Sequence, residues 1–283
     1  MYQPPEMLFE QARKIPEIYG KMDFTITPER FAGEVDDQSE LGNLGGSDRR
    51  PGLLGNAERV AKIRAYTMMG DMAADAYAAL MPKYGFRPLV TMLEQACDAG
   101  LEAVENPPQA LVDLIHAMED APDWLDMALV EEGAKLERNS FANLAPYAIR
   151  GTFLATFMNK YAALPMAMTG TLSNSNSAGR VKETANFFTT TVMPGALERH
   201  GAGFKAAAKV RLMHSMVRFH IMRTNKWDVS IYGAPIPQVD QMPAGMIGMF
   251  LLSMDVLRSG RTQFTPEEQA KVELSRYRCF LLG

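Results

Sequence analysis

Residues that form cross-links or cysteine-based metal sites are scarce in this chain. Its 283 residues include only two cysteines, Cys97 and Cys279. They lie far apart and outside any CxxC pattern, so neither a disulfide framework nor a structural zinc site is indicated. We expect both to be reduced, buried thiols.

Basic charge and long apolar runs are also lacking. With 29 Lys and Arg against 33 Asp and Glu, the formal net charge is -4. No basic excess is available to neutralise phosphates, which argues against nucleic-acid binding and against a polybasic membrane-binding patch. The most apolar stretch, residues 151–170, is interrupted by Asn159, Lys160 and Pro165. It falls short of the roughly 18 uninterrupted apolar residues that a transmembrane helix needs.

The first 20 residues carry scattered charges instead of the unbroken apolar segment of a secretory signal. Together with the absence of a spanning segment, this pattern predicts a cytoplasmic protein.

Helical periodicity dominates what remains. From Leu54 onward apolar residues recur every three or four positions, with almost no alternating pattern, which predicts an all-α fold. Residues 1–53, rich in Gly and Asp after one short helix, are expected to form an N-terminal extension, and residues 54–283 a single multi-helix domain. The expected helices are 56–82, 86–101, 108–120, 123–141 with Asp123 as N-cap, 145–166, 178–193, 203–225, 240–258 and 265–282, the last with a capping box at Thr265.

One helix combines a histidine and an arginine on an apolar face. In RLMHSMVRFHI (residues 211–221), His214 and Arg218 are four apart and share a face, whereas His220 lies on another side. In one interpretation His214 is a core histidine bonded to a carbonyl, and Arg218 pairs with a carboxylate. In the other, His214 is a metal or haem ligand, because haem needs an axial donor for iron and counter-charges for its propionates.

A second helix carries a similar pairing. In SNSNSAGRVKETANFFTTT (residues 173–191), Arg180 and Thr184 share a face that Thr191 continues. If buried, they could hydrogen-bond a polar ligand such as dioxygen; the alternative is that Arg180 is a surface salt-bridge residue. The aromatic and proline residues of 227–240 predict an ordered loop without regular structure. HExxH, P-loop, GxGxxG and GxSxG motifs are absent.

Taken in order, several stretches resemble the latex-clearing protein (rubber oxygenase) and MpaB-like oxygenase family, over roughly residues 55–283. They are GDMAADAYAAL (70–80), APDWLDMALVEEG (121–133), Arg180 with Thr184, KVRLMHSMVR (209–218), WDVSIYGAPIPQVD (227–240) and RYRCFLLG (276–283). The resemblance implies a globin-like helical core holding haem b, with His214 as the proximal iron ligand and Arg218 steadying the haem. Arg180 and Thr184 would line the distal side, where dioxygen and an apolar, isoprenoid substrate meet.

The chain departs from that family at two distal positions. Latex-clearing proteins have a lysine just before the distal threonine, and Glu183 stands there in this chain, as a potential base. The additional distal glutamate has no counterpart, since Leu164, Pro165 and Met166 occupy its expected place. Relatives usually continue past the terminal FLLG, so we expect further C-terminal helices to be missing.

The sequence therefore predicts a haem-dependent oxygenase that oxidises a small apolar, isoprenoid or lipid-like substrate with dioxygen. The alternative is a non-catalytic helical module of the same fold that binds a lipid or a partner protein. A haem sensor or peroxidase-like protein is the third interpretation.

Overall fold

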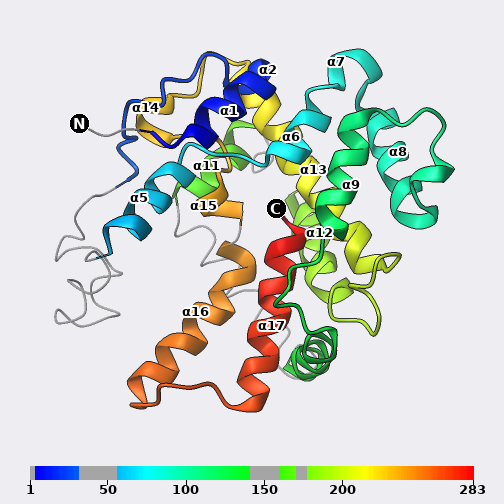
Figure 1. Ribbon diagram of the computed structural model, residues 1–283, viewed down its shortest axis with the longest axis vertical. Coiled ribbons are helices and arrows are strands. Elements are labelled where there is room, and N and C mark those ends of the chain that lie inside the picture. Colours follow the sequence, from blue (N-terminus) through cyan, green and yellow to red (C-terminus); the bar gives the residue numbers. More distant parts are fainter. Residues whose placement is uncertain (1–3, 32–55, 141–159, 170–176, 242) are drawn as a thin grey trace.

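The computed structural model describes residues 4–31, 56–140, 160–169, 177–241 and 243–283. Every regular element in these ranges is a helix, and none of these residues lies in a β-strand (Figure 1). The predicted all-α class is thus confirmed. None of the described helices is both long and apolar enough to cross a bilayer.

The N-terminal helices are attached to the rest of the molecule. The sequence predicts an extension over residues 1–53, of which 1–3 and 32–53 lie outside the described ranges. Within the described part, α1 (Glu6–Lys14) and α2 (Pro16–Tyr19) come first, and α2 packs against the long helix α13 (Ala202–Met222). Leu8, Tyr19 and Phe219 belong to one buried apolar cluster. These N-terminal residues therefore contribute to the protein's interior.

The prediction of a single helix over residues 56–82 is wrong. The structure has three helices there: α5 (Ala57–Tyr66), α6 (Met72–Ala78) and α7 (Met81–Tyr84). The Asp71 carboxylate starts α6 by accepting a hydrogen bond from the Ala74 amide at 3.2 Å. Between α5 and α6 the carbonyl of Thr67 accepts from the Ala234 amide, at 2.9 Å. A distant loop thus takes a backbone acceptor that a continuous helix would have used itself.

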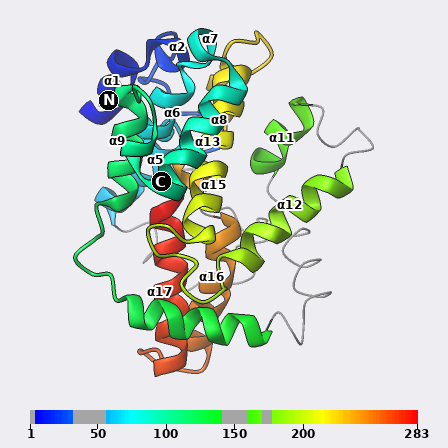
Figure 2. The same ribbon diagram turned by 90° about the vertical axis from the view of Figure 1, so that its right-hand side faces the viewer.

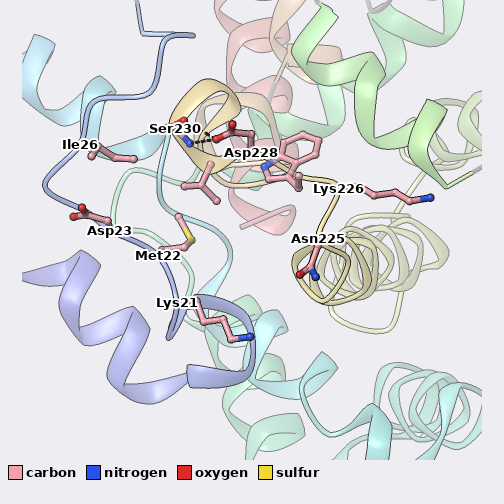
Figure 3. Close-up of a pocket in the computed structure, with 10 residues that line it drawn as sticks. Lys21, Met22, Asp23, Ile26, Asn225, Lys226, Asp228 and Ser230 are labelled. Carbon is pink, nitrogen blue, oxygen red and sulfur yellow. Dashed lines mark hydrogen bonds between the residues drawn. The ribbon is translucent and has the colours of Figure 1, made fainter.

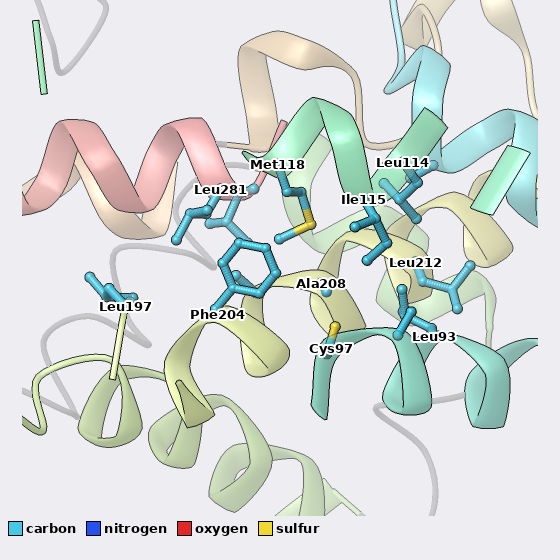
Figure 4. Packing of buried hydrophobic residues seen from close by; sticks show 14 of the residues in the cluster. Leu93, Cys97, Leu114, Ile115, Met118, Leu197, Phe204, Ala208, Leu212 and Leu281 are labelled. Carbon is cyan, nitrogen blue, oxygen red and sulfur yellow. The ribbon is translucent and has the colours of Figure 1, made fainter. Parts of the chain in front are cut away.

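The main core forms around α13, where α6, α8 (Phe86–Ala99), α9 (Gln109–Glu119) and α17 (Pro266–Leu281) meet. A short 3₁₀ turn, η2 (Leu101–Ala103), follows α8. Figure 4 shows Leu93, Met118, Leu212 and Leu281 converging from four of these helices. Burying such side chains is the main source of stability in a helical domain of this kind.

The helix predicted over 123–141 begins later than expected. Residues 127–140 are helical, and the Asp126 carboxylate accepts from the Ala128 amide at 2.9 Å, so the prediction of Asp123 as N-cap is wrong. Gly133 in this helix faces the backbone carbonyl of Ala270, and a Cβ there would collide with it. The helix can therefore cross α17 closely.

Residues 243–283 form a helical hairpin beside the core. Helices α16 (Pro243–Arg258) and α17 lie side by side (Figure 1). The predicted capping box at Thr265 is confirmed, because its side chain accepts from the Glu268 amide while the Glu268 carboxylate accepts from the Thr265 amide.

Two further helices lie along one side of α13 (Figure 2): α11 (Lys160–Met168) and α12 (Ser177–Thr190). Most of the helix predicted over 145–166 lies outside the described residues. The stretch 227–240, predicted to lack regular structure, contains one-turn helices α14 (Val229–Tyr232) and α15, which spans Gln238–Gln241.

Candidate functional site

His214 lies in the middle of α13 and is half-buried. Its Nδ1 atom is buried and has no hydrogen-bond partner. Burial, reinforced by the nearby Arg218 charge, lowers the pKa of His214 to about 4. The imidazole is therefore neutral near pH 7 and keeps a lone pair for an electrophilic partner.

The other three histidines differ from His214 in exposure. His116, His200 and His220 are all exposed, and His200 Nδ1 lies 3.0 Å from the Cys97 carbonyl. The exposure of His220 agrees with its predicted place on another side of the helix. Across the described ranges, no three His, Cys, Asp or Glu side chains are grouped as a metal site would need. Within the described residues, His214 is therefore not part of such a group.

Two buried ion pairs hold the segment of α13 that carries His214. Arg211 bonds the Asp71 carboxylate through Nε and Nη2, the latter at 2.9 Å. Arg218 bonds Asp75 in the same way, with Nε at 2.9 Å and Nη2 at 2.8 Å from Oδ1. Both carboxylates belong to the N-terminal region of α6. Because one pair lies on each side of His214 in sequence, they fix the position and rotation of α13 against α6.

Arg218 is fully buried and connects several segments. Its Nη1 donates to the carbonyls of Pro235, at 3.2 Å, and Ile236. Burial opposes the charge of Arg218, but the adjacent Asp75 carboxylate raises the pKa of its guanidinium above the usual range. The Asp75 pKa is itself raised by burial, with Arg218 acting in the opposite direction. Arg218 thus pairs with a carboxylate, as one interpretation of the sequence expects.

The N-terminal helices complete this polar network. The Tyr19 hydroxyl donates to Asp75, and burial followed by the Asp75 charge raises the Tyr19 pKa, so the phenol stays protonated. The Gln11 side chain accepts from the Gly70 amide at 2.8 Å and donates to the Met68 carbonyl at 3.1 Å. The side chains of Tyr19, Gln11 and Asp75 are buried and hydrogen-bonded, which is how an interior tolerates them, whereas Arg211 keeps a buried Nη1 without a partner.

Gly70 is required by this packing. A Cβ at Gly70 would lie 2.6 Å from Arg218 Nε and equally close to an Asp75 carboxylate oxygen. The glycine that opens GDMAADAYAAL therefore lets the chain pass directly over the Arg218–Asp75 pair.

Sequence reasoning missed Asp71, Asp75, Arg211 and Tyr19 as parts of the site. One signal was present: Asp71 and Asp75 are four apart on an otherwise apolar helix, so they share a face. Two carboxylates on such a face require buried cationic partners.

The predicted distal residues lie on α12, which packs against α13. Arg180 and Glu183 belong to this helix, but their side chains are outside the described part. Thr184 is exposed, whereas Phe187 and Thr191 further along are buried. Phe187 belongs to the same core cluster as Leu212 and Met216 of α13.

Two surface hollows lie among the described residues, and the predicted site residues line neither of them. The first, of about 390 Å³, lies between Lys21–Asp23 and Asn225–Ser230, where Lys and Asp side chains form a polar lining (Figure 3). The second, of about 630 Å³, is mainly apolar and lies where Asp71 and Arg211 meet α17. Neither includes His214, Arg218 or Thr184 in its lining.

Comparisons with known proteins support the family resemblance. The structure is similar to that of a latex clearing protein, LCP, in its closed state, with a TM-score of 0.63 and 19% sequence identity. The match covers 77% of this chain and 59% of that chain, so this chain spans less than two thirds of LCP's length. No curated protein matches the sequence significantly. The family model described as ER-bound oxygenase mpaB/B'/Rubber oxygenase, catalytic domain, matches residues 140–283, just over half of the chain, and the protein therefore belongs to this family.

Proposed function

We propose that this protein is a haem b-dependent oxygenase that oxidises a small apolar substrate, isoprenoid or lipid-like, with dioxygen. Family membership supports an oxygenase. The observation that carries haem dependence is the state of His214: a neutral imidazole with a buried, unpartnered nitrogen, on a helix that two buried ion pairs hold in place. Buried nitrogens in native proteins are nearly always hydrogen-bonded, so this exception calls for a ligand or a functional reason.

The residues around His214 fit a haem group. His214 would hold the haem iron, since it is neutral and needs no proton loss before binding. Leu212 and Met216 of α13, with Phe187 of α12, are buried apolar neighbours along the same two helices and would keep water away. When bound, haem would supply the activation of dioxygen, and the protein would supply the nitrogen donor of His214 and a dry environment.

Arg218 would act by positioning His214. Its guanidinium is held by Asp75 and by the carbonyls of Pro235 and Ile236, so it fixes α13 one turn beyond His214. A ligand histidine on a rigid, tertiary-anchored helix is preorganised, which lowers the cost of ligation.

Arg180, Thr184 and Glu183 are the proposed distal groups. They share one helix, α12, that packs against the His214 helix. Arg180 and Thr184 would donate hydrogen bonds to dioxygen, and the Glu183 carboxylate would accept a proton. Replacing the lysine of latex-clearing proteins with Glu183 changes the charge at this position, so the substrate is expected to differ from rubber.

The decisive experiment is the absorption spectrum of purified protein supplied with haem. The wild type is expected to show a Soret band with stoichiometric iron. His214→Ala should lose this band, whereas the control His220→Ala, an exposed histidine six residues along the same helix, should keep it. Added imidazole should restore the band in His214→Gly. Full haem retention by His214→Ala would refute the ligand assignment.

Oxygen uptake separates the oxygenase from a sensor or a peroxidase. An oxygenase consumes dioxygen when an isoprenoid hydrocarbon is added without peroxide. The oxygenase proposal would fail if substrate oxidation required peroxide, or if no substrate in a panel of apolar alkenes stimulated oxygen uptake. The haem assignment would still stand.

A further inference from the structure

Arg278 on α17 has a buried guanidinium, and only one of its three nitrogens has hydrogen-bond partners. Its side chain is 3% exposed, and its Nη1 donates to both carboxylate oxygens of Glu137, at 3.0 and 2.9 Å. Its Nε and Nη2 atoms are buried and have no hydrogen-bond partner. A charged group that is almost fully buried normally fills all its donors, because leaving them unpaired in a dry interior is costly.

The two free atoms form the edge of the guanidinium that binds carboxylates best. Nε–H and one Nη2–H point in the same direction and match the two oxygens of a carboxylate. The same molecule uses this edge twice: Arg211 fills it with Asp71, and Arg218 fills it with Asp75. At Arg278, Glu137 occupies Nη1 instead and leaves the bidentate edge free.

The position of Arg278 is compatible with a ligand that also reaches α13. Helices α17 and α13 pack together, and Leu274, Tyr277 and Leu281 of α17 belong to the same core cluster as Leu212 and Met216 of α13. An apolar body bound among these helices would bring a carboxylate towards a buried cation. Glu137 balances the formal charge of Arg278, so the pair tolerates burial before the ligand arrives. The Glu137 side chain is 26% exposed, so solvent can screen its charge when a second carboxylate binds.

We propose that Arg278 is an anion-binding residue whose Nε and Nη2 edge receives the carboxylate of an amphipathic ligand with a large apolar body. Two sources share this chemistry: a propionate of haem, which rests on the proposed function, and the carboxylate of a long-chain fatty acid, which is independent of it.

Iron-free protoporphyrin IX tests the carboxylate contact without iron ligation by His214. Its dissociation constant and that of its dimethyl ester, which lacks both carboxylates, are measured by fluorescence titration of the full chain. The wild type should bind the free acid more tightly than the ester. Arg278→Gln should weaken binding of the free acid by about tenfold or more, as expected for a lost charge-assisted bidentate contact, and leave the ester unchanged. Arg278→Lys, which keeps the charge but not the fork, should be intermediate.

Arg276→Gln is the matched control. Arg276 lies two residues away on α17, is 38% exposed, and stacks on Trp124. It should retain the wild-type preference for the free acid. Melting temperatures of all variants show whether each is folded, and the wild-type comparison of acid with ester needs no variant at all.

The second source is tested by the same titrations with palmitate and methyl palmitate. An Arg278-dependent preference for palmitate, with no porphyrin binding and no Soret band, would support the anion site and refute the haem function. The inference would be overturned if the wild type bound neither acid more tightly than its ester, or if Arg278→Gln kept both preferences. A Soret band that depends on His214 would then leave the haem function standing.

Discussion

Replacing Asp75 with asparagine tests the claim that buried ion pairs fix the histidine-bearing helix. The side chains of Asp75 and Arg218 are 0% exposed, and the substitution leaves a guanidinium buried without its counter-charge. Removing one partner of such a pair costs about 3–5 kcal/mol. A domain typically has only about 5–15 kcal/mol of stability, so this is a large fraction. For a protein of this size the melting temperature should fall by about 6–20 °C.

The matched control is Asp98→Asn, which makes the same chemical change in an exposed pair. Asp98 accepts from Lys205 at 2.6 Å, and its side chain is 53% exposed, so its loss should cost less than about 1 kcal/mol. The free energy of unfolding of both variants and of wild type is measured with denaturant at pH 7, with circular dichroism as the signal. Equal destabilisation of the two variants would refute the idea that the Arg218–Asp75 pair anchors α13.

Two further changes probe neighbouring parts of the structure. Gly70→Ala should lower the melting temperature by an amount comparable to Asp75→Asn, because its Cβ would lie 2.6 Å from Arg218 Nε; an unchanged value would show that the polar network can move apart. Glu268→Gln should destabilise the protein at neutral pH but have little effect in acid. Hydrogen bonds from Arg261 and then the Thr265 amide lower the Glu268 pKa from 4.5 to about 2, so its contribution is present above pH 4.5 and is lost as the pH falls towards 2. The free energy of unfolding of both proteins is measured with denaturant across this pH range. A difference between wild type and Glu268→Gln that did not change with pH would show that the Glu268 charge is not the cause.

Helical periodicity predicted most of the fold because it reports a local property. Apolar residues at helical spacing must face an interior, so α8, α9, α13 and α17 could be located from the sequence. The break between α5 and α6 was missed for the opposite reason. It depends on Gly70 passing over Arg218 and on Thr67 bonding Ala234, and both partners lie more than 140 residues away in sequence.

The same limit applies to the site. The turn of about 100° per residue placed His214 and Arg218 on one face and His220 on another. It could not name Asp75 as the partner of Arg218, since many carboxylates in the sequence were equally possible. Likewise, the resemblance drew attention to RYRCFLLG as a motif. That Arg278 bonds Glu137 through Nη1 and leaves Nε and Nη2 without partners can be seen only in the structure.

The packing interpretation of the His214 helix holds for Arg218 but not for His214. A purely structural helix face would satisfy both polar side chains, the arginine with a carboxylate and the histidine with a carbonyl. Arg218 meets this expectation fully through Asp75, Pro235 and Ile236. His214 does not, because its buried Nδ1 has no partner. The network around Arg218 uses buried polar groups to hold α13 in one position, while the histidine within that segment has an unpaired buried nitrogen. This contrast is the reason that we propose ligand binding at His214.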